Sequence, residues 1–330
     1  MKVLHFLMSA ALAALLGGPV AASAQAETIR VGHVDNEAHP KHLAFLKFKD
    51  LVEKASNGKI TVEVYPAGQL GGERELLEAL QSDAVQITCV SNGVMSAFSK
   101  PFMLLDIPFL FKDAAQARKA VDGNQSVLFS ELDGIGMQGL AFWEQGFRQV
   151  SSRSKPINSM DDIKGMKLRT MEAPLHVEAW RALGANPTPM SFGQVYSSLQ
   201  TGVIDGQENP IYVVTQENLV EVQKSVSLTN HIYDAMPVAA SGTWWKGLSD
   251  ENKKIISDAM AEATVYERSL VGAEVEKATK ELAERGVDVA KVPDDVIAAM
   301  KQASQAPVIA KVKAELGDQL VGKWLASIAN

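Results

Sequence analysis

The 330-residue sequence has a single cysteine, no excess of positive charge and only one long hydrophobic run. Because Cys89 has no partner, an intramolecular disulfide is excluded and the hydrophobic core must hold the fold together. The formal net charge of −7 argues against a nucleic-acid partner, since no basic stripe is present to neutralise phosphates. Beyond residue 26, no apolar run approaches the roughly 20 residues that cross a bilayer. We therefore expect a protein that is not itself embedded in a membrane.

Residues 1–26 differ from the rest of the chain. Lys2 precedes an apolar run that ends at Leu16, and small residues with two overlapping A-x-A sequences follow between 22 and 26. A transmembrane anchor is the alternative interpretation, but the run is too short to span a bilayer. The pattern is typical of a cleaved secretory signal peptide and predicts export, most simply to a bacterial periplasm.

Strand-like and helix-like segments alternate in both halves of the chain, whose length suits two lobes of roughly 130–180 residues each. In the first half, strands are expected at TIRVGHV, ITVEVYPAG and QITCVSNG, with helices between them. This β-α-β-α-β order predicts a parallel sheet covered by helices. A second β/α series begins near GLAFWEQGFRQVSS and continues through MKLRTM and VIDGQENP. We therefore predict an α/β protein in which each lobe is a β-sheet flanked by helices.

The longest helical pattern extends from about Ser249, a candidate N-cap, to Arg285. A helix of about 36 residues would be roughly 54 Å long. Because this length exceeds one lobe, we expect the helix to lie across both.

Several short motifs do not support a cofactor or a metal. GIGMQG at 134–139 has the glycine spacing of a dinucleotide site, but a helix-like segment precedes it and a strand-like segment follows, which reverses the required order. His39 and His42 lack further ligands for zinc, and we interpret them as solvent-facing residues at a helix start. Cys89 lies within an apolar strand, which indicates a buried, inert thiol. We predict no cofactor and no metal.

Arg169 ends the strand-like MKLRTM, directly before the helix-like APLHVEAWRALG. A guanidinium beside a helix N-terminus suits a carboxylate, since it offers parallel N–H groups next to a positive helix end. On these residues alone, an ion pair with Glu172 is an equally good interpretation. Arg148 and Asn209 favour a binding site, because two arginines at a cleft between lobes are costly without an anion. Phe192, at a helix start, is either a wall of that site or part of the core.

In the first half, ligand-binding loops are expected at the carboxyl ends of the strands. These ends place His33, Glu73, Ser91 and Asn92 at one edge of the sheet. The residues are hydrogen-bonding groups without a cation, which suits a ligand rich in hydroxyls.

The run KLRTMEAPLHVEAWRALGANPTPMSFGQVYSSLQTGVIDGQENP closely resembles the solute-binding proteins of TRAP transporters (tripartite ATP-independent periplasmic transporters), the DctP-type family. YPAGQLGGERELLEAL, FRQVSSRSKPI and LTNHIY extend the resemblance over nearly the whole mature chain. It implies a two-lobed periplasmic binding protein of the Venus-flytrap type that is not an enzyme. We assign residues 27–146 and about 235–274 to lobe I, and residues 147–234 and about 275–330 to lobe II, with the ligand cleft between them.

The resemblance also implies roles for individual residues. Arg169 is expected to form the salt bridge to a ligand carboxylate, with assistance from Arg148. Asn209 is expected to bind the same end of the ligand, and Phe192 to stack over it. Glu73 matches the position of an acid that accepts ligand hydroxyls in sialic-acid-binding relatives.

Two departures from those relatives disfavour sialic acid as the ligand. Ser91 stands where they carry a glutamate, and His33-Val34 replaces a Met-Asn pair. A second ligand carboxylate would be repelled by Glu73, so we expect a sugar acid such as a uronate or aldonate. A C4-dicarboxylate is the alternative.

The resemblance implies that the partners are the small and large membrane subunits of a TRAP transporter, with uptake driven by an ion gradient. Two other classes of function stay open at this point. One is a periplasmic enzyme that acts on a sugar acid, with Glu73 and His33 as acid and base. The other is a ligand receptor for a sensor kinase.

Overall fold

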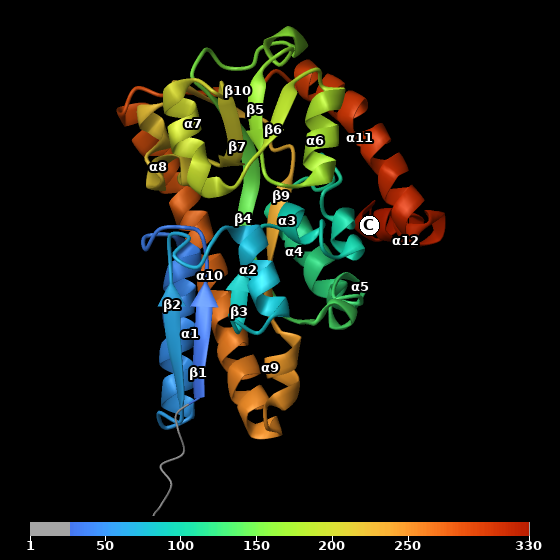
Figure 1. Cartoon of the computed structure of the whole chain (residues 1–330). Helices are drawn as coiled ribbons and strands as arrows, with labels where there is room; N and C mark the ends of the chain where they lie inside the picture. Colours follow the sequence, from blue (N-terminus) through green and yellow to red (C-terminus); the bar gives the residue numbers. More distant parts are fainter. Residues whose placement is uncertain (1–26, 330) are drawn as a thin grey trace, which may run out of the picture.

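The computed structural model describes residues 27–329, which form two α/β lobes stacked one on the other (Figure 1). The predicted signal peptide, residues 1–26, lies outside the described residues. The first lobe contains β1 (Glu27–Gly32), α1 (Pro40–Ala55), β2 (Ile60–Tyr65), α2 (Glu73–Gln81), β3 (Ile87–Cys89), α3 (Asn92–Met95), α4 (Ala114–Gly123), α5 (Gln125–Leu128) and α9 (Gly242–Gly247). The second contains β5 (Lys167–Thr170), α6 (Pro174–Ala182), β6 (Asn186–Pro189), α7 (Val195–Thr201), β7 (Gly206–Pro210), α8 (Ile211–Gln216), β8 (Ser225–Leu228), β10 (Asp288–Lys291) and α11 (Asp294–Leu316).

The first-lobe sheet has the expected parallel core. β1 pairs in parallel with β2 on one side and β3 on the other, which confirms the β-α-β-α-β prediction. β5 likewise pairs in parallel with β6 and β7 in the second lobe. The carboxyl ends of these parallel strands therefore face the junction of the lobes, where a ligand site is expected.

Two long elements, β4 (Met137–Ser152) and α10 (Asp250–Glu284), belong to both lobes. β4 pairs with β9 (Tyr233–Ser241) in the first lobe and with β7 and β8 in the second. Its register shifts between Glu144 and Gly146, and Gly146 has a φ of 88°, a conformation that favours glycine. This bulge coincides with the expected lobe boundary at residue 146.

The predicted long helix is confirmed as α10, which has 35 residues and is about 53 Å long. Ser249 caps it by accepting a hydrogen bond from the backbone N–H of Asn252 at 3.1 Å. α10 packs on α1 and β4 in the first lobe and on α8 and β10 in the second (Figure 1). The helix therefore connects the lobes, as expected.

The C-terminal helix α12 (Asp318–Ala329), which we assign to lobe II from the sequence, packs on elements of both lobes, since it contacts α11 of the second as well as α4 of the first. It lies against α4 of the first lobe, and Gln116 Nε2 donates to the backbone oxygen of Ile328 at 2.8 Å. Its apolar residues Val321 and Trp324 are buried in the same core cluster as α4. That cluster also includes Leu175 of α6 and Val308 of α11, so the apolar face of α12 lies against both lobes.

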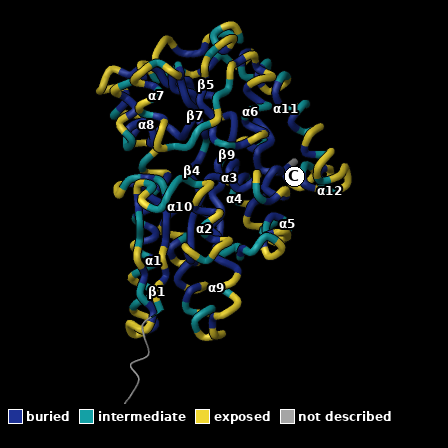
Figure 2. Tube along the Cα trace, in the orientation of Figure 1, coloured by how far each residue is buried: buried dark blue, intermediate teal, exposed yellow. Residues whose placement is uncertain are grey.

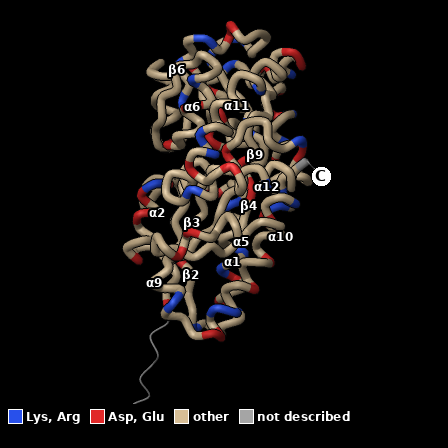
Figure 3. The backbone as a smooth tube through the Cα atoms, turned by 90° about the vertical axis from the view of Figure 1, so that its right-hand side faces the viewer, with Lys and Arg blue, Asp and Glu red and all other residues tan. Residues whose placement is uncertain are grey.

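Burial follows the layers of the α/β fold (Figure 2). β3, β7 and β9 are buried along their whole length, whereas the edge strands β6 and β10 are partly exposed. The region where α3, β4 and β9 meet is also buried (Figure 2), and Cys89 lies fully buried in the first-lobe core. The predicted burial of Cys89 is therefore confirmed, and burial raises the pKa of its thiol, which disfavours the reactive thiolate. Acidic and basic residues are interspersed over both lobes (Figure 3). None of the helices among residues 27–329 is long and apolar enough to cross a membrane.

Candidate functional site

A small cavity lies between the two lobes. Its lining comprises Val34, Asp35, Glu73, Ser91 and Gln145 from first-lobe segments, and Arg169, Met171, Phe192 and Asn209 from second-lobe segments. Most of these residues lie at the carboxyl ends of parallel strands, where ligands bind in open α/β sheets. The cavity volume is about 10 Å³, which holds roughly one water molecule. The lobes must therefore separate before an organic molecule can enter.

Five of the eight predicted site residues line this cavity: Arg169, Asn209, Phe192, Glu73 and Ser91. The other three, Arg148, Asn92 and His33, are buried beside it and bonded to other residues. The structure thus brings together the predicted carboxylate-binding end and part of the predicted hydroxyl-binding end.

Arg169 is buried at the second-lobe side of the cavity, with 3% of its surface exposed. Its Nε and Nη2 donate to the backbone oxygen of Met190 at 3.1 and 2.8 Å. Its guanidinium carbon lies 5.8 Å from the ring centroid of Phe192, within the range of a cation–π contact. Among residues 27–329 it forms no ion pair, and the half-buried Glu172 is not bonded to it. Phe192 also packs on the second-lobe core, so it serves as both wall and core residue.

The electrostatic state of Arg169 is unusual for an arginine. Burial lowers the pKa of its guanidinium to about 10, against the attraction of Glu208, and the nearby charge of Arg148 lowers it further. A buried cation without an adjacent counter-ion is costly. The site would therefore gain stability from an anion bound against Arg169.

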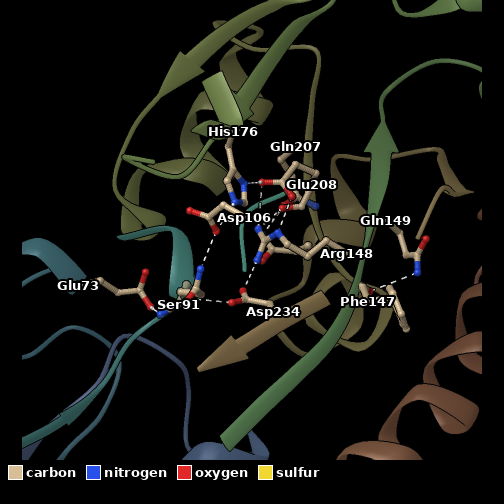
Figure 4. A network of polar contacts seen from close by, with 12 residues as sticks. Glu73, Ser91, Asp106, Phe147, Arg148, Gln149, His176, Gln207, Glu208 and Asp234 are labelled. Atoms are coloured by element: carbon tan, nitrogen blue, oxygen red, sulfur yellow. Dashed lines mark hydrogen bonds and ion pairs between the residues drawn. The ribbon is translucent and has the colours of Figure 1, made fainter. Parts of the chain in front are cut away.

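Arg148, in contrast, already has its counter-ions (Figure 4). It is fully buried, and its guanidinium bonds to the carboxylate of Glu208 and donates from Nη1 to Asp234 Oδ2 at 2.6 Å. His176 extends this network, with Nε2 3.3 Å from Asp106 Oδ1 and Nδ1 3.9 Å from Glu208. Arg148 thus connects buried acids beneath the cavity and does not reach its surface.

Asn92 couples this network to the cavity wall. Its side-chain amide donates to Asp106 Oδ1 at 2.7 Å, and its backbone N–H donates to Asp234 Oδ1 at 3.1 Å. The neighbouring Ser91 donates its backbone N–H to Glu73 Oε1 at 2.7 Å (Figure 4). Asn92 therefore holds Ser91 and Glu73 in place rather than facing a ligand.

His33 belongs to a buried polar cluster behind the first-lobe wall. Its Nε2 lies 3.0 Å from Nδ1 of His42, and Asp35 pairs with Lys41 Nζ at 2.7 Å and lies 3.6 Å from His39 Nε2. The expectation that His39 and His42 face solvent is wrong, since they are 0% and 8% exposed. The buried carboxylate of Asp35 accounts for the position of His39, because it favours cationic and N–H groups around it, while His42 is held by its contact with His33. No cluster of metal-ligating residues was found in the described part of the chain.

The buried histidines predict that stability falls in mild acid. Burial lowers the pKa of His39 from 6.5 to about 4, although Asp35 raises it, and Lys41 and His42 add further repulsion. Tyr212 also packs on its ring. As pH falls below 6.5, the unfolded chain takes up a proton that native His39 does not, so the free energy of unfolding decreases down to about pH 4.

Denaturant unfolding of wild type and His39→Asn between pH 4 and 7 measures this effect. Asparagine keeps an acceptor for the backbone N–H of Lys41, which His39 caps at 3.1 Å, but it does not titrate. We expect a shallower loss of stability for the variant. Identical slopes for the two proteins would contradict the assignment.

Sequence patterns missed two polar residues of the cavity, Asp35 and Gln145. Asp35 lies two residues beyond His33 in the loop after β1, so extending the strand-end rule along that loop would have found it. Gln145 lies in the middle of β4, next to the bulge. No local signal marks it, because its orientation depends on the crossing of β4 between the lobes.

Residues 31–315 match the family model described as "Bacterial extracellular solute-binding protein, family 7". The chain is 34% identical over 289 residues to the 2,3-diketo-L-gulonate-binding periplasmic protein YiaO of Escherichia coli, covering 87% of both chains. It is 34% identical over 311 residues to the C4-dicarboxylate-binding periplasmic protein DctP of Rhodobacter capsulatus, covering 94% of this chain and 92% of that one.

The fold is similar to that of the sugar acid binding protein DctPAm from Advenella mimigardefordensis, whose crystal structure contains galactonate. The TM-score is 0.89 at 32% sequence identity, covering 92% of this chain and 98% of the other. The likeness therefore extends over both lobes and the elements that connect them.

Proposed function

The chain belongs to the family of bacterial extracellular solute-binding proteins, family 7, and we propose that it captures a sugar acid, such as an aldonate or uronate, in the periplasm. It delivers this ligand to the small and large membrane subunits of a TRAP transporter. The observation that carries the proposal is the buried guanidinium of Arg169, which lines the interlobe cavity and forms no ion pair with any acid among residues 27–329. A ligand carboxylate supplies the missing charge.

In the proposed complex, Arg169 binds the ligand carboxylate through its parallel N–H groups, and Asn209 supplies a further donor at the same end. Phe192 covers the carbon chain and keeps the guanidinium oriented. Glu73 and Ser91 accept and donate hydrogen bonds to ligand hydroxyls from the first lobe. Arg148 does not contact the ligand in this complex, because its own guanidinium is bonded to buried acids. Its role is to hold the groups that line the cavity in position.

Binding is coupled to movement of the lobes. The cavity of about 10 Å³ is far smaller than a six-carbon acid, so ligand must enter an open form and be enclosed when the lobes approach. A ligand that bridges Arg169 and Glu73 favours the closed form by its contacts with both lobes. The closed surface then presents the ligand-bound state to the membrane subunits.

Catalysis by Glu73 and His33 as an acid–base pair is disfavoured by the surroundings of His33. His33 does not line the cavity, its Nε2 contacts His42, and burial lowers its pKa to about 3. It is therefore a poor general base or acid near neutral pH. We propose capture without chemical conversion.

A C4-dicarboxylate is the second candidate ligand, because the similarity to the Rhodobacter capsulatus protein equals that to the diketogulonate-binding protein in percent identity. Titration calorimetry with galactonate, glucuronate and succinate separates the two ligand classes. We expect binding of at least one sugar acid about tenfold or more tighter than succinate, equivalent to roughly 1.4 kcal/mol.

The neutral polyol galactitol is the matched control ligand and should not bind, since it lacks the carboxylate. Mass spectrometry of the recovered sugar acid should show it unchanged. Tight binding of succinate with no binding of either sugar acid would overturn the proposed ligand class.

A further inference from the structure

The two sides of the cavity carry opposite charges. Arg169 provides a cation on the second-lobe side. On the first-lobe side the lining includes the carboxyl groups of Asp35 and Glu73, together with the amide of Gln145. The amide oxygen Oε1 of Gln145 is buried and has no hydrogen-bond donor among the described residues. The first-lobe side therefore offers acceptors, which suit hydroxyl groups of a ligand.

Asp35 differs from the other acceptors because a buried cation lies behind it. Lys41 Nζ is 2.7 Å from Asp35 Oδ2, and both side chains are nearly inaccessible to solvent. Asp35 lines the cavity, whereas Lys41 does not. The carboxylate of Asp35 therefore stands between the charge of Lys41 and any ligand.

The surroundings keep Asp35 ionised. Burial by itself would raise the pKa of its carboxyl, but the nearby His39 and Lys41 hold that pKa well below its usual range. Burial instead raises the pKa of Glu73, whose Oε1 is already occupied by the backbone N–H of Ser91. Asp35 is thus the more firmly fixed negative charge at this end of the cavity.

We propose that Asp35, placed between the cavity and Lys41, determines ligand specificity by accepting hydrogen bonds from ligand hydroxyls and rejecting a second ligand carboxylate. The inference rests on the proposed capture of an organic acid by Arg169. With one carboxylate at Arg169, the far end of the ligand meets Asp35. A hydroxyl there forms a charge-assisted hydrogen bond, while a carboxylate is repelled.

Asp35→Asn tests the role of the charge. The substitution removes the anion and leaves Lys41 as an unpaired cation next to the cavity. We expect the affinity for galactonate to fall about tenfold or more and the affinity for succinate to rise by a similar factor. Calorimetric titration of both ligands gives the ratio of the two affinities. If the Asp35–Lys41 ion pair had only a structural role, the substitution would leave this ratio unchanged.

The single variant has two effects, since it removes the charged acceptor and leaves Lys41 unpaired. The double variant Asp35→Asn/Lys41→Met removes both charges, so it tests the loss of the acceptor alone and leaves no buried unpaired charge. It should lose galactonate affinity without gaining affinity for succinate. If the single variant fails to fold, this double variant carries the test. Circular dichroism and thermal unfolding establish that each variant is folded.

Glu217→Gln is the matched control. Glu217 is a half-buried acid whose pKa is raised to about 7, first by burial and then by the charge of Asp35, and its Oε1 accepts the backbone N–H of Asn36 at 3.1 Å, but it does not line the cavity. Its removal should leave the ratio of the two affinities unchanged. A folded Asp35 variant with the wild-type ratio would overturn the inference. If wild type bound no organic acid, the proposed function itself would fail before any variant was compared.

Discussion

Replacing Arg169 by alanine should abolish ligand binding and leave the ligand-free protein folded. Truncating one partner of a buried, hydrogen-bonded charge pair costs roughly 2–5 kcal/mol, or about 30-fold to several thousand-fold in affinity. In the ligand-free protein Arg169 has no ion pair, and its only side-chain hydrogen bonds among the described residues are to the backbone oxygen of Met190. Its removal relieves a buried charge, so thermal stability should be unchanged or higher. Calorimetry and thermal unfolding measure the two effects.

Arg153→Ala is the matched control, because Arg153 lies in the same lobe, is exposed and donates to the backbone oxygen of Leu199. It should bind ligand as wild type does. Near-wild-type affinity in a folded Arg169→Ala protein would refute the assignment of the carboxylate-binding residue.

Replacing Arg148 by methionine should destabilise the fold by about 3–5 kcal/mol, because it leaves buried acids without their cation. Glu208 and Asp234 are both buried, and both bond to this guanidinium. Lysine at this position should recover only part of the stability, since it supplies the charge but not the planar guanidinium with its several N–H donors. Denaturant unfolding of the ligand-free proteins gives these differences.

The expected result distinguishes a structural role of Arg148 from the direct ligand contact that the family resemblance implies. Lys100→Met removes an exposed ion pair with Glu315 and should cause no measurable change in stability. Wild-type stability of Arg148→Met combined with weak ligand binding would show that Arg148 acts on the ligand rather than on the fold.

The sequence allowed prediction of those features that depend on local pattern. The alternation of strands and helices predicts the parallel pairing around β1 and β5, and the long apolar pattern predicts α10 with Ser249 as its cap. The position of Arg169 at the end of a strand, before a helix, singles it out as a candidate, but on that pattern alone an ion pair with Glu172 is equally good. Arg148, Asn209 and the family resemblance favour a binding role. These inferences need no knowledge of contacts between distant segments.

The features that the sequence did not predict depend on such contacts. The partners of Arg148, Glu208 and Asp234, lie 60 and 86 residues away along the chain. The burial of His39 depends on the charge of Asp35 and on packing against Tyr212 of the second lobe. The partners of Arg148 are thus distant in the sequence, whereas for His39 the charged partner Asp35 is only four residues away and the distant contact is the ring of Tyr212.

A crystal structure with bound galactonate tests the central claim most directly. We expect the ligand carboxylate on Arg169 and Asn209, with the hydroxyl end directed toward Asp35 and Glu73. Density with the carboxylate on the first-lobe side, and Arg169 bonded only to the backbone oxygen of Met190, would contradict it.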